Sequence, residues 1–312
     1  MSRSIDLLKH RYLKNIKENP GLFVGIELEY PVVNLEGDAT DVEVIKYLFR
    51  YLVSALDLTV EKVDDFGNPY GRFWQSKFGS TANIRRKQLE IFGTQKGIEL
   101  AKQILIQKIK NCAEHLEDLK IKREAKKAFL DKQIKEMKRY IYQIKLVEGN
   151  VSEKRGTLMG YEGNAAKIYY QTLSELMPKE FKFEKRSMHP AEDEFNAMLN
   201  YAFGILYSKV EKACIIAGLD PYIGIIHTDN YGKKSLVFDI IEGYRHLASR
   251  TVFSLFTQKK VQKYFFKREG DGVILVGDGK KVLVESFYNR LEKKVRYNNR
   301  NISNLDKLQF EC

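Results

Sequence analysis

The chain has 312 residues, 44% of them hydrophobic and 30% charged, with 6 prolines and 21 glycines; this excludes a disordered or collagen-like protein and favours a helix-rich globular one of about two domains. Its net charge of +12 is uneven, because residues 1–70 hold 8 Lys and Arg against 12 Asp and Glu, whereas the remainder carries a net +16. A basic body of this kind is typical of nucleic-acid-binding proteins, although solvated Lys-rich helix faces give the same balance.

The N-terminus, MSRSIDLLKHRYLK, has no long apolar segment, and no stretch of the chain approaches the ~18 uninterrupted apolar residues that a membrane span requires. The three cysteines, Cys112, Cys214 and Cys312, are odd in number and far apart. They exclude a disulfide framework and a four-thiolate zinc site. We therefore expect a cytoplasmic protein that does not enter a membrane.

Residues 1–70 predict a small α/β segment. The alternation over residues 20–35 predicts a strand with Glu27 and Glu29 on one face, followed by a helix that starts near Thr40 or Asp41. A second short strand is expected at residues 58–63. The turn DDFGNP at residues 64–69 coincides with the change in charge, and it predicts a boundary between a domain at 1–70 and another at 71–312.

The second domain is expected to be mainly α-helical. Residues 71–93 predict a short extended piece and a basic loop, and apolar residues at helical spacing predict a core-facing helix from Gly97. Residues 120–145 carry many lysines and predict a solvated helix or helical hairpin. The remaining expected elements are helices at 152–176, 191–217 (stopped by Gly218 and Pro221) and 236–257, a hairpin turning at residues 277–279, and a final amphipathic helix.

Three acidic residues and one histidine are candidates for chemistry. Glu162 has small neighbours in LMGYEGNAAKIYY, and His227 closes the apolar run in GLDPYIGIIH. Asp239 and Glu242 share one face of a helix that Ser235 is expected to cap. Each residue also has an ordinary structural explanation: a lone Glu or His is usually structural, and Glu242 has Arg245 and His246 nearby as partners.

Taken together, two carboxylates and an imidazole form an incomplete ligand set for Mg²⁺ or Mn²⁺. Such an ion polarises a phosphodiester and lowers the pKa of a bound water or hydroxyl. Zinc is a weaker match, since no pair of thiolates is spaced for it. Spacing alone does not decide between this metal site and the structural explanations.

Several linked motifs resemble the Cas1 family of CRISPR adaptation integrases over residues 71–312. In chain order they are GRF, the N-x-R-R-x-Q motif beginning at Asn83, Lys108 with Asn111, MGYEGNAAKIYY, HPAEDEFNAMLNYAFGILY, GLDPYIGIIH and LVFDIIEGYR. The resemblance implies a helical catalytic lobe whose metal ligands are Glu162, His227 and Glu242, with Asp239 in a supporting position. Both acids of the last motif belong to it, so Asp239 remains an alternative third ligand.

The resemblance also implies a reaction and partners. In this family the 3′-hydroxyls of a short double-stranded DNA attack the repeat array, and the same metal supports hydrolytic cleavage. Arg85, Arg86, Lys108 and Arg245 would contact phosphates, which fixes position without reading sequence. A homodimer and a small Cas2 partner are implied as well.

The front of the chain departs from that family. The N-terminal domain of Cas1 proteins is β-rich and makes the homodimer, but residues 1–70 show no such series of strands. The segment FVGIELEYPVVNLEGDATDVEVIKYL instead resembles the start of a glutamate-cysteine ligase, in which the counterparts of Glu27 and Glu29 belong to a metal and ATP site. The leading hypothesis is therefore an integrase lobe behind a foreign segment; the alternatives are a non-catalytic DNA-binding scaffold and a carboxylate-amine ligase remnant.

Overall fold

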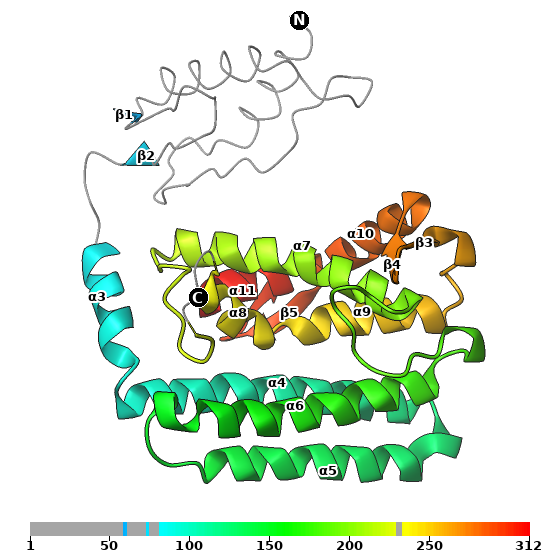
Figure 1. The fold of residues 1–312 in the computed structure, drawn as a ribbon, viewed down its shortest axis with the longest axis horizontal. Helices are drawn as coiled ribbons and strands as arrows, with labels where there is room; N and C mark the ends of the chain where they lie inside the picture. The colour runs from blue at the N-terminus through cyan, green and yellow to red at the C-terminus, as the bar shows by residue number, and fades with distance from the viewer. Residues whose placement is uncertain (1–58, 61–72, 75–80, 229–232) are drawn as a thin grey trace, which may run out of the picture. The chain divides into compact units, whose positions relative to one another are not determined.

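A computed structural model describes residues 59–60, 73–74, 81–228 and 233–312 (Figure 1). Contacts divide the chain into two units, Met1–Ala82 and Asn83–Cys312. In the first unit β1 (Thr59–Val60) pairs antiparallel with β2 (Phe73–Trp74). The strand expected over residues 20–35, the helix after it and the boundary turn at 64–69 lie outside the described residues.

The second unit is mainly α-helical, as expected. Its α-helices are α3 (Thr81–Ile91), α4 (Gln95–Ile121), α5 (Lys127–Lys145), α6 (Val151–Leu176), α7 (Glu194–Ile216), α8 (Ser235–Glu242), α9 (Arg245–Thr257), α10 (Gly277–Glu292) and α11 (Asn304–Glu311). Short 3-10 helices are η1 (Glu124–Lys126), η2 (Lys179–Phe181) and η3 (Lys263–Phe265). Two antiparallel hairpins complete it, formed by β3 (Phe266–Glu269) with β4 (Gly272–Leu275) and by β5 (Lys294–Tyr297) with β6 (Arg300–Ser303). None of the helices in the described ranges is long and apolar enough to cross a membrane.

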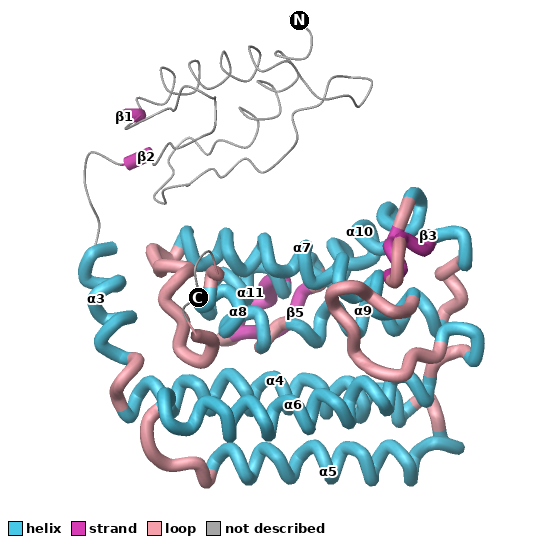
Figure 2. The backbone as a smooth tube through the Cα atoms, viewed as in Figure 1, coloured by secondary structure: helices cyan, strands magenta, loops and turns pink. Residues whose placement is uncertain are grey.

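The helices of this unit form two packed groups (Figure 2). The chain runs along α4, returns along α5 and turns again into α6, so these three helices lie side by side (Figure 1). Helix α7 packs against α8, α9 and α11, and α10 packs against α9. Helix α4 joins the two groups because it contacts α8 and α9 as well as α5 and α6.

Capping residues explain why several predicted helices have the expected bounds. Thr94 accepts a hydrogen bond from the Gly97 amide at the start of α4, and Asn150 accepts one from Glu153 at the start of α6. Helix α7 ends at a glycine, because Gly218 has a φ of +75° and the Leu219 amide donates back to the Cys214 carbonyl. The predictions for 152–176, 191–217 and the helix from Gly97 are confirmed to within a few residues.

The solvated helix or helical hairpin expected at 120–145 is found as helix α5, which turns back along α4, but the expectation that it is solvated was wrong. Helix α5 buries four side chains, Leu130, Ile134, Met137 and Ile144, against α4 and α6. Their spacing follows one helix face, but the many lysines on the other face masked this stripe in the sequence. Helix α5 is therefore part of the core.

Two further element predictions need correction. The basic loop expected within 71–93 is in fact helix α3, which carries Arg85, Arg86 and Lys87. The single helix expected at 236–257 is broken after Glu242, because the Gly243 carbonyl leaves the helical ladder and accepts from the side chain of Asn111 at 2.7 Å.

The hairpin expected to turn at 277–279 was also placed wrongly. Strand β4 pairs with the segment before it, and the turn contains Gly270, whose φ is +55°. Residues after Gly277 continue as helix α10. A short apolar run does not show whether its strand partner precedes or follows it.

Candidate functional site

Helix α8 presents two buried acids one turn apart, Asp239 and Glu242. Ser235 begins this helix without capping it; its hydroxyl donates to the Thr228 carbonyl at 2.8 Å, which fastens the preceding loop to the helix. A Cβ on Gly224 would lie 2.6 Å from the Ser235 side chain, so only glycine lets the loop pass this close to α8. The loop that carries His227 is thus held directly against α8.

Asp239 is fully buried and holds that loop through four contacts. Its Oδ2 accepts from the amides of Ile225 at 2.5 Å and Ile226 at 3.0 Å, and its Oδ1 accepts from the His227 amide at 3.0 Å. The same Oδ1 lies 2.7 Å from His227 Nδ1. Because a carboxylate only accepts, Nδ1 carries a proton, and in the neutral imidazole Nε2 keeps a free lone pair. Asp239 therefore orients the imidazole and leaves Nε2 available as a ligand or base.

Glu242 belongs to a different cluster, centred on the ammonium of Lys108. Lys108 lies on α4 and Glu162 on α6, and the Lys108 Nζ forms ion pairs with Glu162 Oε1 and Glu242 Oε2. All three side chains are at most 15% exposed. Neither of those two carboxylate oxygens accepts a hydrogen bond from another group in the described part of the chain. The structure thus brings together two of the predicted site acids around one cation.

Arg245 forms the other side of this cluster. Its Nε lies 2.8 Å from Glu242 Oε1, and its guanidinium lies 4.6 Å from the centre of the Phe203 ring. Arg186 approaches the same ring at 5.4 Å. Arg186 donates to the side-chain oxygens of Asn196 and Asn200, so it fastens the segment before α7 to that helix.

The charges in this cluster reinforce one another. Burial alone would raise the pKa of Glu242, but the neighbouring charges of Lys108 and Arg245 outweigh burial and lower it to about 2. Burial opposes the charged form of Lys108 too, yet Glu242 and Glu162 raise its pKa above the ordinary value. Glu242 is therefore ionised at neutral pH.

The residues offer part of a divalent-metal site. The carboxylates of Glu162 and Glu242 converge on one cation, which is the arrangement a hard divalent ion needs from oxygen ligands. Within residues 81–228 and 233–312, however, no group of three or more His, Cys, Asp or Glu side chains is arranged to hold an ion. The carboxylate pair fits a metal ion, while His227 is bound to α8 through Asp239 and not to the pair.

The four residues expected to contact DNA phosphates occupy two places. Arg85 and Arg86 lie on α3; Arg86 is exposed, and Arg85 Nε lies 3.4 Å from Asp220 Oδ2. Gln88 of the same helix exchanges two hydrogen bonds with the Asp220 backbone, at 3.1 and 2.9 Å. Lys108 and Arg245, in contrast, point at the carboxylates of the cluster.

Sequence reasoning missed the roles of Gly224 and Phe203 and the position of Lys108 between the two acids. Gly224 had a signal, since a glycine interrupts the apolar run before His227.

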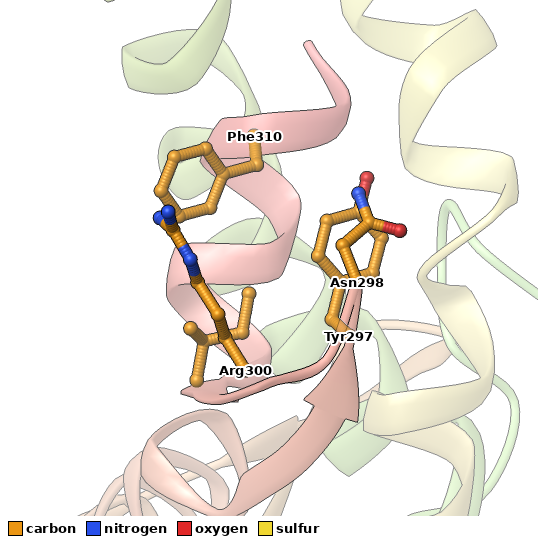
Figure 3. A pocket seen from close by; sticks show the side chains of 5 residues that line it. Tyr297, Asn298, Arg300 and Phe310 are labelled. Atoms are coloured by element: carbon orange, nitrogen blue, oxygen red, sulfur yellow. The ribbon is translucent and has the colours of Figure 1, made fainter.

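A separate pocket between the β5–β6 hairpin and α11, lined by Tyr297, Arg300 and Phe310, contains none of the predicted site residues (Figure 3).

Comparisons with known proteins agree on one family. The family model described as "CRISPR associated protein Cas1" matches residues 41–289. A CRISPR-associated endonuclease Cas1 from Archaeoglobus fulgidus is 30% identical over 309 aligned residues, covering 91% of this chain and 89% of the relative. One from Fusobacterium nucleatum is 25% identical and covers 100% of this chain and 92% of the relative. These alignments extend into residues 1–70, and nothing in them supports the resemblance to a glutamate-cysteine ligase.

Solved structures show the same fold. A Cas1 protein from Thermotoga maritima superposes with a TM-score of 0.60 at 26% identity, covering 73% of this chain and 67% of that one. A casposase bound to its integration product superposes with a TM-score of 0.66 at 24% identity, covering 77% and 69%. The mainly α-helical fold predicted for residues 71–312 is confirmed.

Proposed function

Because this chain belongs to the Cas1 family, we propose that it is a DNA endonuclease and integrase of CRISPR spacer acquisition, with its chemistry in residues 71–312. The observation that carries the proposal is the convergence of Glu162 and Glu242 on one buried cation. A relative named as an endonuclease and a casposase solved with an integration product support the same class of reaction.

A Mg²⁺ or Mn²⁺ ion would be held by Glu162, Glu242 and the Nε2 of His227. Asp239 is a positioning residue, since its oxygens are already engaged by three amides and the imidazole. This geometry favours Glu242 over Asp239 as the third ligand. When bound, the ion would supply Lewis-acid activation of a phosphodiester.

The reaction is a transesterification at phosphorus. A DNA 3′-hydroxyl attacks a phosphodiester of the repeat, the bond from phosphorus to the displaced 3′-oxygen breaks, and that oxygen leaves with a proton. With water as the nucleophile the same site hydrolyses DNA. Arg85 and Arg86 on α3 hold the duplex by its phosphates.

The partners follow from the same class of protein. Double-stranded DNA is the substrate, and a homodimer with a small Cas2 protein is the working assembly. Structures named as Cas6-RT-Cas1–Cas2 complexes superpose on this chain, one of them with a TM-score of 0.64 at 25% identity and 77% coverage of this chain.

Integration and cleavage of a fluorescent DNA duplex in Mn²⁺ test the proposal. Glu162→Ala and His227→Ala are expected to abolish both products, because each removes a ligand. Lys281→Ala, whose side chain is 82% exposed, serves as the matched surface control and is expected to react like the wild type. DNA binding by the wild type without any metal-dependent product would contradict the proposal and support the non-catalytic scaffold.

A further inference from the structure

Lys108 is held where its ammonium meets both carboxylates. Asn111, one turn further along α4, donates to the Gly243 carbonyl at the end of α8 at 2.7 Å, and Gln107 donates to the Asn111 side chain at 2.7 Å. These bonds fix α4 against α8. The Lys108 side chain is 14% exposed and its ammonium lies against Glu162 and Glu242.

The place taken by this ammonium is the place at which a metal ion would meet the two carboxylates. The oxygens that face Lys108 accept no hydrogen bond from other described groups, so the ammonium is their direct partner, while Arg245 pairs with the other oxygen of Glu242. An ammonium and a divalent ion cannot share that space, and their like charges repel at short range.

Lys108 and Arg245 differ in how easily they can leave. Arg245 is fixed by its bond to Glu242 and by the Phe203 ring. The Lys108 ammonium is a point charge on a flexible four-carbon chain, so it can turn from these carboxylates to another anionic partner without moving the helix. A DNA phosphate is such a partner.

We propose that Lys108 competes with the divalent ion for the Glu162–Glu242 pair, and that DNA promotes metal loading by drawing the ammonium to a phosphate. The inference rests on the proposed function, since it takes these two acids as metal ligands. DNA and the ion then bind cooperatively, and by linkage each strengthens the other by the same factor. The site loads its ion when the substrate is present.

Manganese binding measures this directly. Mn²⁺ is titrated into the protein with and without a short DNA duplex, and the free ion is followed by electron paramagnetic resonance. The wild type is expected to bind Mn²⁺ weakly alone and about tenfold more tightly with DNA. Lys108→Met is expected to bind tightly without DNA and to gain little from it. The double variant Glu162→Gln, Glu242→Gln with the same duplex corrects for ions held by DNA.

Three further variants make the test decisive. Lys102→Met removes another buried lysine of α4, which pairs with Glu99, and is expected to behave like the wild type. Lys108→Arg keeps the positive charge, and its binding of Mn²⁺ without DNA is expected to remain weak. Lys108→Gln is a second neutral variant, to be used if the methionine variant folds poorly. Neutral variants that bind Mn²⁺ no more tightly than the wild type would overturn the competition. Unchanged binding by the double glutamine variant would instead refute the metal site itself.

Discussion

The loop around His227 and the cluster around Lys108 both depend on an acid of α8, but the two acids are satisfied in different ways. Asp239 is bonded to three backbone amides and an imidazole. Among the residues that the structure describes, the ion-pair partners of Glu242 are the side-chain cations Lys108 and Arg245. Backbone donors cannot move away without unfolding the loop, whereas a lysine can exchange its partner.

Under the proposed function, this difference separates a positioning acid, Asp239, from an acid that would bind the ion, Glu242. A carboxylate whose oxygens are taken up by the backbone has little left for an ion, and it stabilises the fold. A carboxylate neutralised by a flexible cation contributes less to stability, because two like charges, those of Glu162 and Glu242, are brought close together. Substitutions at the two places should therefore separate stability from activity.

The largest effect is expected at Asp239. Asp239→Ala leaves the buried amides of Ile225 and Ile226 and the half-buried amide of His227 without their acceptor, and we expect the free energy of unfolding to fall by about 4 kcal/mol. Urea denaturation at pH 7 measures the change. Asp131→Ala is the control, since that carboxylate is 52% exposed in its pair with Lys120 and should change stability by less than about 0.5 kcal/mol. A loss at Asp239 no larger than the control's would show that the amides find other partners.

The positioning acid also shows what the sequence could predict. Asp239 and Glu242 three residues apart predict one helix face, and the apolar run ending at His227 predicts a loop edge; both follow from local periodicity. Local reasoning also located the ends of α6 and α7, where caps and Gly218 provide the signal. It failed at Gly243, because the carbonyl that breaks the helix is taken by Asn111, 132 residues earlier in the chain.

The cluster around Lys108 could not be predicted from local sequence patterns either, because its members are far apart in the chain. Lys108, Glu162 and Glu242 lie on three helices, and only the packing of α4 against α6 and α8 brings them together. The family resemblance named all three residues, but it assigned Lys108 to DNA phosphates. Its place between the acids is visible only in three dimensions.

A second prediction concerns the stability of the protein at acidic pH. Neighbouring positive charges lower the pKa of Glu242 from 4.5 to about 2, so its contribution to stability is nearly constant between pH 7 and pH 5 and is lost only as the pH falls below 4.5, where the unfolded state takes up the proton. Burial lowers the pKa of His115 well below its ordinary value and that of His246 to about 3. Below pH 6.5 these histidines take up protons only in the unfolded state, so stability falls as pH falls.

Between pH 7 and pH 5 we expect a loss of about 2 kcal/mol for each of the two histidines, measured by urea denaturation. His246→Asn should remove about half of that dependence, while Glu242→Gln should leave it unchanged. If the pH dependence of stability disappeared in Glu242→Gln, its cause would be the cluster around Lys108 and not the two histidines.

The smallest effect on stability is expected at Glu162. Glu162→Gln keeps the size of the side chain and an oxygen that accepts from the Lys108 ammonium, and Glu242 still neutralises that ammonium. We expect the free energy of unfolding to change by about 1 kcal/mol or less, although DNA cleavage is lost. Asp239→Asn is the matched variant, since it also replaces a carboxylate by an amide. We expect it to lower the free energy of unfolding far more, because the new side-chain NH₂ group would face backbone N–H donors. Equal losses in the two variants would mean that Glu162 is as structural as Asp239, and the distinction between positioning and ligand acids would fail.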